Sequence, residues 1–198
     1  MSNRQQLQLE NNGNNHGTMV GVNNGTINNV TLTNIARLPS IISSIIKSII
    51  DKLPENLQDS NILSMAPFTI EGKLDFNNVI KYREIINDSS VYYDMCNRIL
   101  DVYDDSNLGG KEKILKTVHQ LYLEEKGDIL RKHCDSKSPQ EVIRSNSDVL
   151  IDAVKVKISE MIRNDLGTTG VYEEELLLGL TCFICYCFME CKILERPV

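Results

Sequence analysis

The sequence predicts a mainly α-helical protein, in which a multi-helix domain follows a short Gly/Asn-rich β segment that pairs between copies. Apolar residues recur at helical spacing over most of residues 35–198, and capping and turn residues divide that pattern into separate helices. Residues 1–34 instead place short β-branched stretches between Asn-Gly turns. A chain of 198 residues is long enough to bury a core.

Residues 1–34 differ from the rest of the chain in composition. They contain ten Asn and four of the eleven Gly, but only two charged side chains, Arg4 and Glu10. Asn-Gly favours tight turns because both residues tolerate positive φ, so we expect two or three short strands. The segment is either a flexible arm or a set of strands that pair with other copies, and its low charge favours pairing. The residues expected to self-associate are Gly13, Gly17, Val20, Gly21, Val22, Gly25, Ile27, Val30 and Leu32.

Residues 35–66 are expected to form an Ile-rich helix and a connector. Ser40 can cap a helix whose isoleucines fall at helical spacing between residues 41 and 50. This narrow aliphatic stripe fits either a core helix or a helix between subunits. Pro54 and Pro67 bracket the poorly periodic connector. The stripe residues expected to self-associate are Ile42, Ile45, Ile46 and Ile49.

Residues 67–198 are expected to form a helical domain. Ser138 followed by Pro139 and Glu141 is a capping pattern that opens a short helix. Gly127 can interrupt the helix that precedes it. The predicted helices cover about 76–86, 91–103, 111–125, a short stretch from 138, a long one from 147, and 172–194.

Four cysteines near the C-terminus have a spacing that suggests a zinc or iron–sulfur site: Cys182, Cys185, Cys187 and Cys191. The thiolates of such a site must converge on one point, whereas successive helical residues rotate by about 100°. Cys187 should therefore face away from Cys182 and Cys185, so we expect the cysteines to pack in the core. No metal or other cofactor is expected.

No catalytic constellation can be assembled from the sequence. His16, His119 and His133 do not share a helix at ligand spacing, and no Ser-His-Asp or Cys-His arrangement is visible. The glycines of residues 13–25 lack the strand, the helix and the lysine of a phosphate-binding loop. We therefore expect that the chain is not an enzyme.

The formal net charge of −6 argues against direct nucleic-acid binding, which needs a basic face, and against adsorption to an anionic membrane. The uncharged stretch 176–189 is shorter than the roughly 20 residues that a membrane-spanning helix needs. Residues 1–30 have neither the apolar run nor the basic start of a signal peptide. The expected location is the cytoplasm.

Four segments occur in an order typical of one protein family. They are 70–82, the acidic and Tyr-rich stretch 92–105, residues 113–115 with 121–122, and 191–197. In these segments, which span about residues 65–198, the chain resembles the C-terminal domains of bacterial ABC-three-component conflict systems, related to Lamassu-type anti-phage defence. The Gly/Asn repeat is also similar to segments found upstream in these systems. None of the four segments is catalytic.

The resemblance implies a role in an operon that also encodes an ABC-type ATPase, which senses damage or invading DNA, and a middle or effector component. These are the expected partners, besides further copies of this chain. The family's effectors fuse a toxic domain to such a C-terminal domain, but only about 65 residues precede it here. Any toxic activity is therefore expected in a partner, unless the chain acts by assembly.

These observations predict a non-enzymatic oligomerisation and partner-docking component of an anti-phage defence system. It is expected to self-associate through its N-terminal strands and its apolar helices, because tethering raises the local concentration of the repeats. The alternative is a membrane-disrupting effector that releases and inserts the apolar segment 41–50 or 176–189.

Overall fold

The computed structural model of the protein describes residues 39–56, 69–133, 138–163, 165 and 170–197. The chain divides between Ala36 and Arg37, and every described residue belongs to the second unit. Within these ranges the regular structure is helical and contains no strand, which confirms the expected multi-helix domain. The expected β segment over residues 1–34 and most of the connector after the first helix lie outside the described residues.

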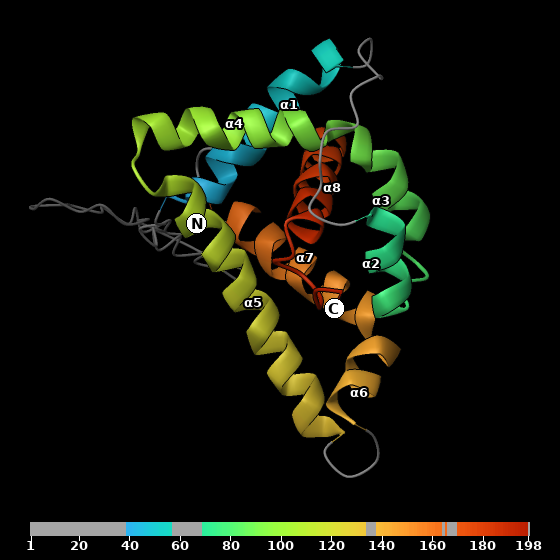
Figure 1. The fold of residues 1–198 in the computed structure, drawn as a ribbon. Coiled ribbons are helices and arrows are strands. Elements are labelled where there is room, and N and C mark those ends of the chain that lie inside the picture. The colour runs from blue at the N-terminus through green and yellow to red at the C-terminus, as the bar shows by residue number, and fades with distance from the viewer. Residues whose placement is uncertain (1–38, 57–68, 134–137, 164, 166–169, 198) are drawn as a thin grey trace, which may run out of the picture. The chain divides into compact units, whose positions relative to one another are not determined.

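Short connections join most of the helices (Figure 1). In chain order they are α1 (Ile41–Asn56), α2 (Ile70–Asn77), α3 (Arg83–Ser89), the 3-10 turn η1 (Ser90–Tyr92), α4 (Tyr93–Ser106), α5 (Gly110–Lys132), α6 (Pro139–Ser145), α7 (Ser147–Arg163) and α8 (Glu173–Met189). Helix α1 belongs to the same unit as the helices that follow it. The boundary expected between residues 66 and 67 therefore does not separate two structural units.

Helix α8 forms the centre of the core because its second half is apolar on all sides. Almost all of residues 180–189 are buried. Helices α1, α3, α4 and α7 each pack against α8, which is drawn in red in Figure 1. Cys182, Cys185 and Cys187 are among its buried residues, as expected for cysteines that pack in the core.

Helix α1 packs against α8 through the isoleucine stripe. Four of its isoleucines are no more than 3% exposed: Ile42, Ile45, Ile46 and Ile49. A glycine lets the two helices approach closely, because a Cβ at Gly179 would lie 2.6 Å from Cγ1 of Ile50. The burial of the stripe by its own chain fits a core helix and does not fit a helix between subunits.

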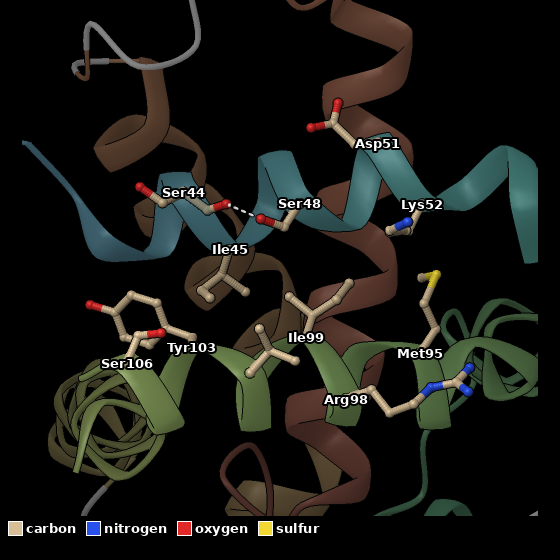
Figure 2. Close-up of a pocket in the computed structure, with 11 residues that line it drawn as sticks. Ser44, Ile45, Ser48, Asp51, Lys52, Met95, Arg98, Ile99, Tyr103 and Ser106 are labelled. Carbon is tan, nitrogen blue, oxygen red and sulfur yellow. Dashed lines mark hydrogen bonds between the residues drawn. The ribbon is translucent and has the colours of Figure 1, made fainter. Parts of the chain in front are cut away.

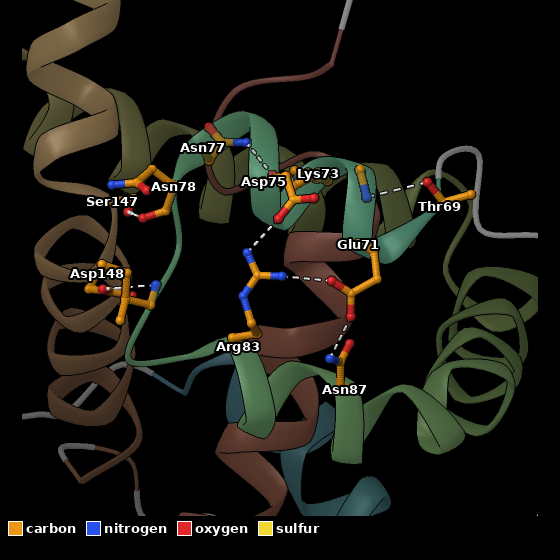
Figure 3. A network of polar contacts seen from close by, with 12 residues as sticks. Thr69, Glu71, Lys73, Asp75, Asn77, Asn78, Arg83, Asn87, Ser147 and Asp148 are labelled. Carbon is orange, nitrogen blue, oxygen red and sulfur yellow. Dashed lines mark hydrogen bonds and ion pairs between the residues drawn. The ribbon is translucent and has the colours of Figure 1, made fainter.

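The single helix predicted over residues 76–86 is wrong. A turn separates α2 from α3, and Asn78 adopts the left-handed conformation in it, with φ 53° and ψ 45°. Asn tolerates this conformation, which ends a helix. The carboxylate of Asp148 in α7 accepts hydrogen bonds from the backbone N–H groups of Ile80 (3.2 Å) and Lys81 (3.0 Å), and so fixes the turn (Figure 3).

Helices α2 and α3 are also joined by side chains. Figure 3 shows the guanidinium of Arg83 between the carboxylates of Glu71, at 2.7 Å, and Asp75, at 2.6 Å. Asn87 donates a further hydrogen bond to Glu71, at 2.8 Å. These contacts are exposed to solvent, so we expect them to orient the two helices more than to stabilise the fold.

Two other helix boundaries differ from the prediction and one agrees with it. Ser138 and its capping box open α6 as predicted. Helix α5 continues through Gly127, because one glycine in a helix costs only about 1 kcal/mol. Helix α8 ends at Met189 and not near residue 194, because Cys191 and Leu194 take φ of 55° and 62°, which turns the chain back.

Candidate functional site

The residues expected to self-associate fall into two groups. The nine that lie between residues 13 and 32 are outside the described residues. The four in α1 face α8 and other helices of the same chain and present almost no surface to a second copy: Ile42, Ile45, Ile46 and Ile49. We therefore assign these four side chains to the core, although Ile45, at 2% exposure, also lines a groove at the surface.

Two of the four segments that carry the resemblance, 70–82 and 191–197, meet in the fold, where α2 holds the residues that follow α8. Lys73 of α2 is only 2% exposed, and its Nζ donates hydrogen bonds to the carbonyl oxygens of Phe188 and, at 2.9 Å, Ile193. It also lies 4.2 Å from the centre of the Phe188 ring. Burial lowers the pKa of Lys73 to about 8. The ammonium thus neutralises the carbonyl end of α8, where a cation is favoured.

Asn77, one turn further along α2, binds the same chain end. Its side-chain amide donates to the carbonyl oxygen of Glu195 at 2.9 Å and accepts from the backbone N–H of Glu195 at 2.9 Å. It also donates to the carbonyl oxygen of Lys73 at 3.0 Å. This pair of bonds to one residue imitates a backbone ladder and fixes the position of residue 195.

Helix α5 completes the contact from the other side. The side chain of Glu195 accepts hydrogen bonds from Tyr122 (2.5 Å) and Lys126 (2.7 Å), and His119 Nδ1 lies 3.1 Å from the carbonyl oxygen of Lys192. Burial alone would raise the pKa of Glu195, but the hydrogen bonds from Lys126 and Tyr122 outweigh it and lower the pKa.

These residues form what we name the C-terminal clamp: Lys73, Asn77, His119, Tyr122, Lys126 and Glu195. Its donors are used by carbonyl groups and a carboxylate of the chain itself. Such an arrangement holds the chain end in place. The sequence segments 70–82 and 191–197 therefore come together for a structural reason.

The buried thiols are poor nucleophiles and poor metal ligands in the folded chain. Burial raises the pKa of Cys182 to about 12 and that of Cys185 to about 11, so both thiols are protonated at neutral pH. Within the described ranges, no three or more His, Cys, Asp or Glu side chains are grouped so that they could hold a metal ion.

The apolar segments that the membrane alternative uses belong to α1 and α8. Both helices contribute buried side chains to the core of the folded chain. In the part of the chain that the structure describes, no helix combines the length and the apolar character needed to cross a bilayer.

A groove of about 750 Å³ lies between α1 and α4 (Figure 2). The two helices run antiparallel along it, so that Ser44 lies opposite Tyr103 and Lys52 lies opposite Met95. We name it the α1–α4 groove. Its length of two to three helical turns is sufficient for a short helical segment of another protein.

The floor of the α1–α4 groove is apolar and its edges are polar. Ile45 from α1 and Ile99 from α4 point into the space between the helices (Figure 2), and Val102 of α4 is 67% exposed. Ser48 and Arg98 lie at the edges. An apolar floor with a polar rim is typical of surfaces that bind an amphipathic helix.

The sequence predicts a helix over residues 91–103, but it does not identify a docking surface there. The missed signal is Val102, which lies three residues after Ile99 and seven residues after Met95. Periodicity alone cannot show that one end of such a stripe is covered by α1 while the other end is exposed.

Comparisons with family models, curated proteins and solved structures found no match to this chain.

Proposed function

We propose that this chain is a non-enzymatic assembly module of a bacterial anti-phage defence system, which docks protein partners and associates with itself in the cytoplasm. The observation that carries the docking role is the α1–α4 groove, with its exposed Val102 and its polar edges. An exposed valine between polar residues loses contact with water when a partner helix covers it, and this burial favours binding.

The self-association role also draws on the uncharged Gly/Asn repeat of residues 1–34. The helical unit supplies a folded, charged body, and the repeats tethered to it reach a high local concentration when bodies associate. Strand pairing between copies then follows association and does not precede it.

The self-association role is tested by measuring the mass of the full chain in solution with light scattering after size exclusion. We expect a mass above that of one chain, and a lower mass for the Gly21→Val, Gly25→Val double variant, because valine disfavours the positive φ of these turns. A wild-type mass of one chain at every concentration contradicts the self-association role. An unchanged mass in the variant shows that the repeat takes no part.

The docking role predicts a gene for an ABC-type ATPase beside this one, and it is tested with that ATPase. Co-purification of the ATPase with the full chain should be lost in Val102→Asp, which places a charge on the floor of the α1–α4 groove. Val156→Asp is the matched control, because Val156 of α7 is also more than half exposed and lies outside the groove. Equal recovery with both variants, or the absence of such a gene, contradicts this role.

A further inference from the structure

Helix α4 carries an apolar stripe with the spacing of a two-helix contact. Met95, Ile99 and Val102 follow one another at intervals of four and three residues, and the small polar Ser106 continues the same face four residues later. Met95 is buried, Ile99 is half-buried and Val102 is 67% exposed. The stripe therefore begins in the core and emerges into the α1–α4 groove, where a second helix can contact it.

Two opposite charges lie on one edge of this stripe. Arg98 and Asp105 are seven residues apart, so they lie two turns apart on the same edge of α4, on either side of Val102. Both are exposed. Among the residues that the structure describes, neither side chain has an ion-pair partner. About 10 Å of helix separates the two residues, so they are well placed for a partner outside the chain and badly placed for each other.

We propose that the α1–α4 groove binds helix α4 of a second copy of this chain, in an antiparallel pair about a two-fold axis near Val102. This inference rests on the self-association role proposed above and assigns the groove to a second copy, so the ATPase and the second copy would compete for it. A two-fold axis makes contacts reciprocal, so Arg98 lies opposite Asp105 of the partner subunit, and Asp105 lies opposite Arg98 of the partner subunit. Two ion pairs form at once, with the exposed valines between them.

The charges also determine the direction of the pair. In a parallel pair, one edge of a helix faces the opposite edge of its partner, so Arg98 would not meet Asp105 of the partner subunit and neither ion pair would form. In an antiparallel pair, the same edge of both helices comes together, and charges at such edge positions set the orientation of paired helices. The two side chains therefore favour the antiparallel pair and contribute nothing to the parallel one.

Helix α1 leaves space for the incoming helix. Ser44 and Ser48, one turn apart, line its side of the groove, and serine is small. The hydroxyl of Ser48 already donates a hydrogen bond to the carbonyl oxygen of Ser44 at 3.0 Å (Figure 2). Covering this edge therefore does not leave that hydroxyl without a partner.

The charges are tested by sedimentation velocity on the full chain over a range of concentrations. Arg98→Asp and Asp105→Arg each convert both ion pairs into like-charge contacts, so each should weaken dimerisation about tenfold or more. The double variant exchanges the two charges and restores both pairs, so its dissociation constant should return to within about threefold of wild type. Circular dichroism confirms that each variant keeps its helices.

The position of the axis is tested by a disulfide. Val102→Cys should give a covalent dimer under mild oxidation, because the axis places residue 102 close to residue 102 of the second copy. The wild-type chain measures the background from its own cysteines, and Val156→Cys is the control for an exposed valine elsewhere.

The outcomes separate this inference from the proposed function. The two-fold α4 pair is overturned if the wild-type chain associates, both single charge variants associate equally well, and Val102→Cys forms no covalent dimer. That result leaves the self-association role standing. A wild-type chain that is a monomer at every concentration overturns both. Weakening in both single variants, with recovery in the double variant, supports the pair.

Discussion

Replacing Asn77 by leucine should destabilise the folded chain by about 2–4 kcal/mol. Asn77 is 0% exposed, and its side chain makes three hydrogen bonds, two of them to the backbone of Glu195. Each bond contributes about 1 kcal/mol, and each buried group left without a partner costs about 1–3 kcal/mol more. Leucine is similar in size, so the change removes polar contacts without opening a large cavity, and its apolar burial offsets part of the loss.

The measurement is urea unfolding of the full chain, followed by circular dichroism, together with amide hydrogen exchange over residues 190–197. We expect the exchange of this segment to increase more than that of α8, because Asn77 binds the segment directly. Asn87→Leu is the matched control. The side chain of Asn87 makes one exposed hydrogen bond, to Glu71, so its loss should cost less than about 0.5 kcal/mol.

A free energy of unfolding for Asn77→Leu within about 0.5 kcal/mol of the Asn87→Leu value would refute the reasoning. Unchanged exchange over residues 190–197 would refute it independently. Either result means that the C-terminal clamp does not hold the chain end.

Three further predictions concern packing and pH. Gly179→Val should destabilise the chain by about 1–3 kcal/mol, because the added atoms meet Ile50. An unfolding midpoint equal to that of the wild-type chain would contradict the close approach of α1 and α8. Gly127→Ala should stabilise it by about 0.5–1 kcal/mol, since no atom lies within 4 Å of the new Cβ, and a loss of stability would show a hidden contact. Unfolding free energies measured from pH 7 to 11 should fall above about pH 9. The pKa values of Cys182 and Cys185 are raised from 9.0 to about 12 and 11, so the unfolded thiols lose their protons first. Lys73 of α2 acts in the opposite sense, because burial lowers its pKa to about 8. A free energy of unfolding that rises all the way to pH 11 would contradict the burial of the thiols.

The sequence was most informative where a local signal coincided with a long apolar stripe. The isoleucines of α1 predicted a helix that the structure confirms, and the capping residues Ser138 and Glu141 predicted the start of α6. It failed where tertiary contacts override periodicity. Asn78 ends α2 inside a stretch that reads as helical, because Asp148 stabilises the turn from 70 residues away.

The functional surface was harder to predict than the fold. Apolar residues at helical spacing identify the helix faces but not the neighbour that covers each face. The isoleucine stripe of α1 looked equally suited to a core and to an interface. Periodicity does not distinguish Val102 from other residues of α4, although it is exposed in the groove beside that same helix.

The sequence by itself determined the helical class, the apolar faces and the contrast between an uncharged N-terminal repeat and a charged body. These properties depend on the order and chemistry of neighbouring residues. Only the tertiary structure decided that the stripe of α1 is core, that Lys73 and Asn77 hold the C-terminal segment, and that α1 and α4 leave a groove. Burial and long-range hydrogen bonds depend on which helices meet, and that is a property of the whole packed unit.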